Sequence, residues 1–117
     1  MPRAEATVND HGKSVRYEGV PVSEILKKAG APMGDDLHGK ALASYVLAEG
    51  RDGYQVLYSM AELDPALTQA KVLLADRMDG KPLPDSVGPF RLIAPEDKKL
   101  PRSVRMLEKL ELVRLQP

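Results

Sequence analysis

The chain has 117 residues, with 17 basic and 17 acidic side chains and no cysteine. The length suits one domain with a modest core, so we expect a single domain over residues 1–117. Zero net charge argues against a general nucleic-acid binder, and the lack of cysteine excludes disulfides and thiolate-bound metals. No apolar run approaches the ~20 residues of a membrane-spanning helix, and the N-terminus lacks the apolar segment of a signal peptide.

The N-terminal part of the chain predicts a β-hairpin followed by a helix. Short β-prone runs at 6–8 and 14–17 flank the turn-forming residues 9–12. Pro21 suits the first turn of a helix, and apolar residues then recur at helical spacing until a glycine and a proline end the pattern. We therefore expect an amphipathic helix over residues 21–29.

A second hairpin is expected in the middle of the chain, after a polar loop at 33–40. Apolar and β-prone residues predict a strand over 42–49 and a returning strand over 54–59. The glycine-flanked residues 50–53 between them are typical of a turn.

The following segment alternates short buried runs with turns. Residues 60–67 predict one or two helical turns, and the continuous apolar runs at 72–75 and 90–94 predict buried strands. An Asp-Gly turn and a proline-rich loop at 82–89 separate the two strands. Pro101 suits the start of a helical turn, whereas residues 107–115 fit a helix about as well as a strand.

The histidines and the paired carboxylates give little support for a metal site. His11 and His38 lie beside glycines in expected loops, so we interpret them as exposed loop residues. The adjacent carboxylates at 35–36 and 96–97 are typical of solvated surface. Common glycine-rich phosphate-binding motifs are absent from the sequence.

The pattern of positive charge suggests a site for an anion. Arg91 stands inside the otherwise apolar run 89–95, so it either points outward from an edge strand or is buried beside an anionic partner. Guanidinium groups in such places grip carboxylate or phosphate groups through two hydrogen bonds. A basic surplus after Pro95 fits either a solvated face or a small-anion site. This basic cluster comprises Lys98, Lys99, Arg102, Arg105, Lys109 and Arg114, opposed by Glu108 and Glu111.

Five segments, in this order and spacing, resemble the oxidoreductase molybdopterin-binding domain, which is the catalytic domain of the sulfite oxidase family. The resemblance covers roughly residues 7–115. Its segments are Gly19–Gly30, Asp52–Tyr54, Leu74–Pro84, Gly88–Pro95, and Arg102–Met106 running into Leu112–Val113.

The resemblance implies an α+β domain of mixed β-sheets with short helices, and it favours a strand over 107–115. Members of the family bind a pyranopterin cofactor, molybdopterin, whose dithiolene holds molybdenum and whose phosphate is held by basic and polar side chains. The positions that match cofactor-binding motifs of the family are Asp52, Tyr54, Arg91, Arg102, Ser103 and Arg105.

The sequence departs from the family at the metal. Family enzymes hold molybdenum through a cysteine on a strand that here corresponds to residues near Thr7 to Asn9, and this chain has none. A thiolate is the soft ligand that completes the protein's share of the coordination, and threonine or asparagine cannot replace it. The chain also begins almost where the core shared with the family begins. We therefore expect a short stand-alone member without its own metal ligand.

Three functions follow from the resemblance. The favoured one is a pterin- or anion-binding domain, or a relic of one, without a molybdenum redox centre. The alternatives are an active molybdenum-dependent oxidoreductase for a small sulfur-containing substrate, alone or with a redox partner subunit, and a structural accessory protein. Many bacterial members are exported, so the resemblance favours the periplasm if a precursor carried a signal peptide, and the cytoplasm otherwise.

Overall fold

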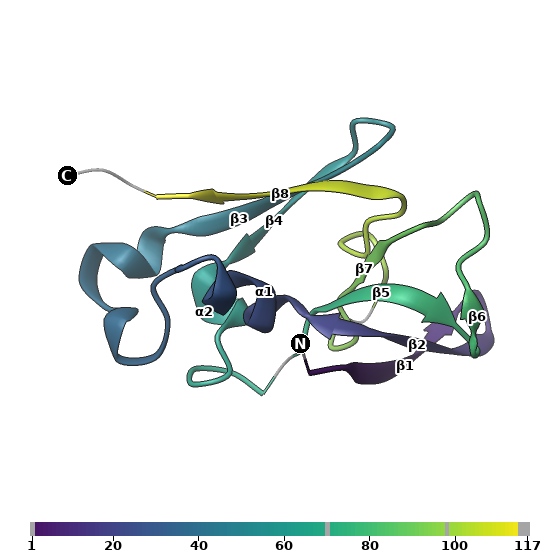
Figure 1. Ribbon diagram of the computed structural model, residues 1–117, viewed down its shortest axis with the longest axis horizontal. Coiled ribbons are helices and arrows are strands. Elements are labelled where there is room, and N and C mark those ends of the chain that lie inside the picture. Colours follow the sequence, from purple (N-terminus) through teal and green to yellow (C-terminus); the bar gives the residue numbers. More distant parts are fainter. Residues whose placement is uncertain (1, 70, 98, 115–117) are drawn as a thin grey trace.

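Two antiparallel β-sheets and four short helices make up the computed structural model, which describes residues 2–69, 71–97 and 99–114 (Figure 1). The α+β class expected from the resemblance is confirmed. Most of the regular structure is strand, as frequent prolines and glycines favour short elements joined by turns.

The first sheet contains the N-terminal hairpin. Strands β1 (Ala4–Asp10) and β2 (Lys13–Pro21) pair along their lengths, and β2 continues the sheet to β5 (Leu73–Met78). The later half of β5 pairs with β6 (Lys81–Pro82), and its first half pairs with β7 (Arg91–Ile93). The hairpin and both buried strands predicted from the sequence are therefore present.

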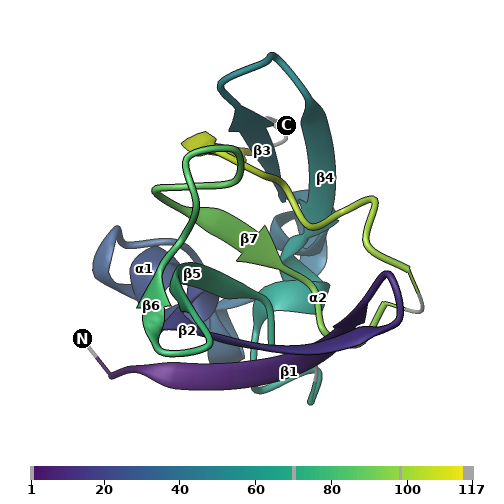
Figure 2. The same ribbon diagram turned by 90° about the vertical axis from the view of Figure 1, so that its right-hand side faces the viewer.

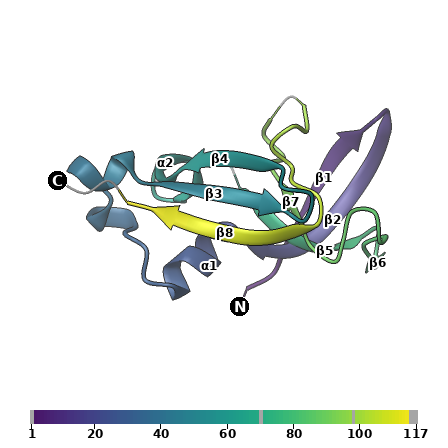
Figure 3. The same ribbon diagram turned by 90° about the horizontal axis from the view of Figure 1, so that it is seen from above.

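The second sheet has three strands in the order β4-β3-β8 (Figure 3). Strand β3 (Tyr45–Gly50) pairs with β4 (Gln55–Ser59) as the predicted second hairpin, and with β8 (Leu107–Val113) on its other side. The C-terminal segment is thus a strand, as the resemblance favours. The final residue of the expected 107–115 strand lies outside the described residues.

The helices are short. Helix α1 (Val22–Lys28) lies where the periodicity predicts it, and α2 (Met60–Leu63) is opened by a capping box between Ser59 and Glu62. Two 3₁₀ turns, Gly34–Asp36 and Gly39–Ala43, precede β3. Within the described part of the chain, no helix is long and apolar enough to cross a membrane.

Two sequence predictions need correction. The strand predicted to begin at residue 42 begins at Tyr45, because the 3₁₀ turn runs through Ala43 and Tyr45, opposite Ser59, is the first residue paired with β4. The helical turn predicted from Pro101 is absent: residues 101–102 form a turn closed by the hydrogen bond from Ser103 N–H to the Leu100 carbonyl, and the chain then bends toward β8. The carbonyl of Val104 accepts a hydrogen bond from the backbone N–H of Leu92, so this segment flanks β7 and cannot coil.

The core has two parts, and β7 lies between them. Successive residues of a strand point to opposite faces. Leu92 accordingly packs with the helices and the second sheet, whereas Ile93 packs with Val8 and Tyr17 of the hairpin. Figure 2 also shows β7 between the β1–β2 hairpin and the β3–β4 hairpin. Arg91 shares the face of Ile93, so its side chain is directed toward the hairpin.

A close approach between β2 and β5 explains the glycine at position 19. The register shifts between Glu18 and Gly19, and a Cβ on Gly19 would lie 1.9 Å from the carbonyl oxygen of Leu74 and 2.7 Å from the Cα of Ala75. Both contacts are with backbone atoms, which cannot move away as a flexible side chain could. The first sheet therefore requires glycine here.

We predict that Gly19→Ala lowers the free energy of unfolding by about 3 kcal/mol, near the top of the usual range for overpacking. The matched control is Gly30→Ala, where a Cβ meets nothing within 4 Å and only the positive φ of +83° opposes alanine, at a cost of about 1 kcal/mol. Urea denaturation measures both. Equal losses in the two variants would contradict the close approach.

Candidate functional site

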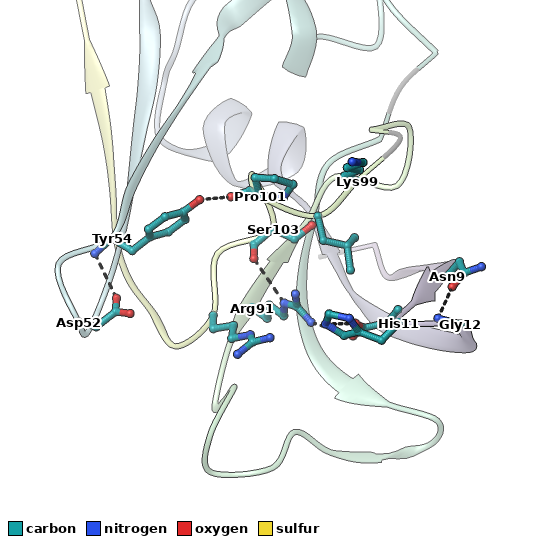
Figure 4. Close-up of a pocket in the computed structure, with 12 residues that line it drawn as sticks. Asn9, His11, Gly12, Asp52, Tyr54, Arg91, Lys99, Pro101 and Ser103 are labelled. Carbon is teal, nitrogen blue, oxygen red and sulfur yellow. Dashed lines mark hydrogen bonds and ion pairs between the residues drawn. The ribbon is translucent and has the colours of Figure 1, made fainter.

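A cleft of about 660 Å³ opens where the two sheets meet. Its volume falls within the range of small-molecule sites. Three segments form its walls: the β1–β2 turn, the β3–β4 turn, and the segment 99–105 that leads into β8. Figure 4 shows Arg91 between the first two, with His11 and Gly12 on one side and Asp52 and Tyr54 on the other.

Arg91 is buried at the base of this cleft, with 3% of its surface exposed. Its Nη1 donates to the hydroxyl of Tyr17 at 2.8 Å and lies 3.5 Å from Oδ2 of Asp10, and its Nε lies 3.5 Å from the carbonyl oxygen of Ser103. Of the two readings left open by the sequence, burial beside an anion is the correct one. Among the described residues, no acceptor is bonded to Nη2.

Asp10 reaches the cleft because of the hairpin geometry. It pairs with Lys13 across a two-residue turn in which His11 and Gly12 both have positive φ, the geometry that best matches strand twist. Alternation along β1 places Asp10 on the buried face of Val8. The Asp10 side chain therefore points to the same side of the hairpin as Val8, where it lines the cleft.

The two oxygens of Asp10 differ in their surroundings. Oδ2 faces Arg91 and accepts a long 3.5 Å hydrogen bond from the Tyr17 hydroxyl. Oδ1 is inaccessible to solvent and has no hydrogen-bond donor within the described ranges. Nε2 of His11 lies 3.5 Å from Oδ1, on a side chain that is 85% exposed. A buried acceptor of this kind is uncommon and calls for an explanation.

Tyr17 is buried behind Arg91 and Asp10, and its phenol stays protonated. Burial raises the pKa of its phenol, although the charge of Arg91 acts in the opposite direction. The hydroxyl keeps its proton at neutral pH, so it accepts from Arg91 and donates toward Asp10 at the same time. The guanidinium also lies 5.7 Å from the centroid of the Tyr17 ring.

The opposite wall comes from the β3–β4 turn. Oδ1 of Asp52 accepts from the backbone N–H of Tyr54 at 3.1 Å, which fixes the turn. The Tyr54 ring is 46% exposed, and its hydroxyl donates to the carbonyl oxygen of Pro101 at 2.5 Å. This bond ties the two walls together on the side of the cleft away from the hairpin.

The segment 99–105 contributes both anchoring and charge. The hydroxyl of Ser103 accepts from the backbone N–H of Ala94 at 3.1 Å, so Ser103 fastens the segment to the end of β7. Lys99 and Arg105 line the cleft with exposed side chains, and neither forms a salt bridge to a described residue. With Arg91, they set three cationic groups against the carboxylates of Asp10 and Asp52.

Arg102 lies outside this cleft. Its guanidinium forms a two-point hydrogen bond to Asp97, with both distances 3.0 Å, and an ion pair of 2.7 Å to Glu62. These hydrogen bonds raise its pKa further, so it stays charged. It stacks 4.7 Å from the centroid of Tyr58, whose hydroxyl donates to the Arg102 carbonyl oxygen and whose pKa is raised by burial.

The structure thus gathers most, not all, of the residues expected to bind the cofactor. Five of the six line the cleft: Asp52, Tyr54, Arg91, Ser103 and Arg105. The basic cluster is dispersed, because Lys109 pairs with Glu111 on β8 and Arg114 follows the end of that strand. Lys98 lies outside the described residues.

Several cleft residues had not been predicted from the sequence. The most important is Asp10, which the turn chemistry of residues 9–12 had concealed. A usable signal existed, because alternation from Val8 places Asp10 on the buried face. The others had no comparable signal and are Asn9, His11, Gly12, Leu100 and Pro101, whereas Lys99 had been expected as part of the basic cluster.

A comparison with protein-family models identifies the chain. The model described as the oxidoreductase molybdopterin binding domain matches residues 4–116. No curated protein matches the sequence significantly. The match covers nearly the whole chain, so this protein belongs to the oxidoreductase molybdopterin-binding domain family.

Glu62 gives a pH-dependent test of the Arg102 cluster. Burial opposes ionisation of Glu62, but the backbone N–H of Ser59 and the guanidinium of Arg102 outweigh it and lower the pKa below the ordinary 4.5. A lowered pKa in the folded state means that the ionised group stabilises the protein above pH 4.5. This contribution disappears as the pH falls through the folded-state pKa.

We predict that Glu62→Gln loses about 1 kcal/mol of stability at pH 7, the upper size for a partly exposed ion pair, since glutamine still caps α2. The difference from the unsubstituted protein should shrink as the pH falls below 4.5 and vanish once Glu62 is protonated in the folded state, as measured by urea denaturation. Glu111→Gln, in an exposed pair on β8, is the control and should change little. A difference that stays constant as the pH falls below 4.5, down to acid denaturation, would contradict the assignment.

Proposed function

We propose that this member of the molybdopterin-binding family binds a pterin that carries a phosphate, in the cleft above Arg91, and has no molybdenum redox centre of its own. The observation that carries the proposal is the buried guanidinium of Arg91. It faces a cleft of ligand size and keeps one nitrogen without an acceptor in the described structure. Keeping a cation there costs free energy, which an anionic or carbonyl-bearing ligand would offset.

The donor set fits the organic part of molybdopterin. Lys99 and Arg105 offer exposed cations for the phosphate, and Arg91 and the unpartnered Oδ1 of Asp10 offer a donor and an acceptor for a polar ring edge. The exposed ring of Tyr54 provides an apolar surface on the opposite wall. When bound, such a group supplies a polar heterocycle and an anion, and the chain's own residues orient it and exclude water from its inner edge.

The donor set does not fit the metal. The sequence has no cysteine, and the strand positions near Thr7 to Asn9 carry no thiolate. Val8 packs into the core and the Asn9 side chain accepts from the backbone N–H of Gly12 at 2.9 Å, so both are committed to the hairpin. In the part of the chain that the structure describes, no three His, Cys, Asp or Glu side chains are grouped to hold a metal ion.

We predict that the chain, expressed in a host that makes the pterin cofactor, purifies with pterin and without stoichiometric molybdenum. Pterin is measured by fluorescence after release and metal by mass spectrometry. Arg91→Ala should lose most of the pterin, since the cleft then lacks its central donor. Lys109→Ala, which removes a cation on β8 outside the cleft, is the matched control and should retain it.

Three other outcomes of this experiment would each contradict the proposal. Stoichiometric molybdenum would overturn the proposal in favour of an active molybdenum oxidoreductase. Absence of both pterin and metal, in a host that loads another family enzyme in parallel, would overturn it in favour of a structural role. Pterin retained in a folded Arg91→Ala protein would show that the cleft is the wrong site.

A further inference from the structure

The unpartnered oxygen of Asp10 points to a specific kind of ligand. Among the described residues, Oδ1 of Asp10 is the buried side-chain polar atom that lacks a hydrogen-bond partner. An ionised carboxylate can only accept, so what is missing is an N–H or O–H donor. Leaving such an acceptor unsatisfied carries a desolvation cost. A ligand that brings a donor to Asp10 recovers this cost.

The other oxygen of the same carboxylate, Oδ2, faces Arg91. Nη1 of Arg91 is 3.5 Å from the other oxygen of Asp10, which is too long for a strong charge-assisted bond. This long bond involves Oδ2 alone, so Oδ1 of Asp10 still has no donor and Nη2 of Arg91 no acceptor among the described residues. Together they present the cleft with a carboxylate acceptor next to guanidinium donors.

This pairing complements one edge of a pterin. The 2-amino-4-oxo edge carries two donors, the amino group and the adjacent ring N–H, followed by a carbonyl oxygen. We propose that Asp10 accepts from the amino group and ring N–H of this edge while Arg91 donates to its 4-oxo oxygen. The inference rests on the proposed function and adds to it the orientation of the ring and the basis of its selectivity.

A ligand can reach Oδ1 of Asp10 if the exposed His11 side chain rotates away from it. The His11 side chain lies over Oδ1, with Nε2 at 3.5 Å, and it is 85% exposed. At that distance it forms at most a weak contact, so rotating the ring into solvent costs little. With the ring edge at Asp10 and Arg91, the anionic arm of the ligand is left to the exposed cations Lys99 and Arg105 on the facing segment.

The experiment compares two ligands that differ in one group. 6-Carboxypterin and 6-carboxylumazine share the ring system and the anionic arm, but lumazine has an oxygen in place of the 2-amino group. That oxygen would face the Asp10 carboxylate and repel it. We expect the unsubstituted protein to bind 6-carboxypterin at least about tenfold more tightly, as sites built around a ligand donor do. Fluorescence titration measures both affinities.

Asp10→Asn tests which residue makes the distinction. An asparagine amide can donate to the 2-oxo oxygen of lumazine, so the preference should fall below about threefold or invert. Asp85→Asn makes the same change at an exposed position in the loop between β6 and β7 and should keep the full preference. If Asp10→Asn fails to fold by circular dichroism, the ligand comparison on the unsubstituted protein still decides the matter.

The outcomes separate the two proposals. If neither compound binds, the proposed function fails. If both bind the unsubstituted protein equally tightly, or Asp10→Asn keeps the full preference, a pterin site stands and the role of Asp10 is overturned. Guanine presents the same amino-oxo edge, so guanosine monophosphate is titrated in parallel, and tighter binding of that nucleotide would overturn the pterin assignment.

Discussion

Burying the charge of Arg91 is the constraint on which the meeting of the two sheets depends. An arginine side chain with only 3% of its surface exposed is costly unless its N–H groups find acceptors, and the structure supplies acceptors from three separate parts of the chain. Tyr17 comes from β2, Asp10 from the end of β1, and the Ser103 carbonyl from the segment entering the second sheet. The N-terminal hairpin and the C-terminal segment are thus joined through one side chain of β7.

The same arrangement leaves the site incompletely satisfied, and this is where binding becomes possible. Among the described residues, Nη2 of Arg91 has no hydrogen-bond acceptor and Oδ1 of Asp10 has no hydrogen-bond donor. In a purely structural ion pair the partners satisfy each other's hydrogen bonds. Arg102 does this with Asp97 and Glu62. The contrast assigns the two arginines different roles. Arg102 is held by Asp97 and Glu62 and fixes the segment 99–105, whereas Arg91 faces the cleft.

The sequence predicted the local elements well, because hairpins, the amphipathic helix and buried strands depend on neighbours in the chain. It predicted the site in part: Arg91 stood out as a cation in an apolar strand, but its partner could not be found from the sequence. Asp10 is 81 residues away, and only the pairing of β1, β2, β5 and β7 brings it there. Arg102 was chosen by motif and charge, and neither reveals that Asp97 and Glu62 occupy its guanidinium. The C-terminal strand was ambiguous because its pairing with β3 is also long-range.

The central claim is that a pterin binds in the cleft between the hairpin turn and the segment 99–105, against Arg91. The most direct measurement is an NMR titration of the full chain with 6-carboxypterin, following backbone amides and the Arg91 Nε–Hε signal. The account predicts that the Arg91 signal and the amides of His11, Gly12 and Arg105 shift together along one binding curve. Saturable shifts confined to residues around Arg102, with the Arg91 signal unmoved, would contradict it.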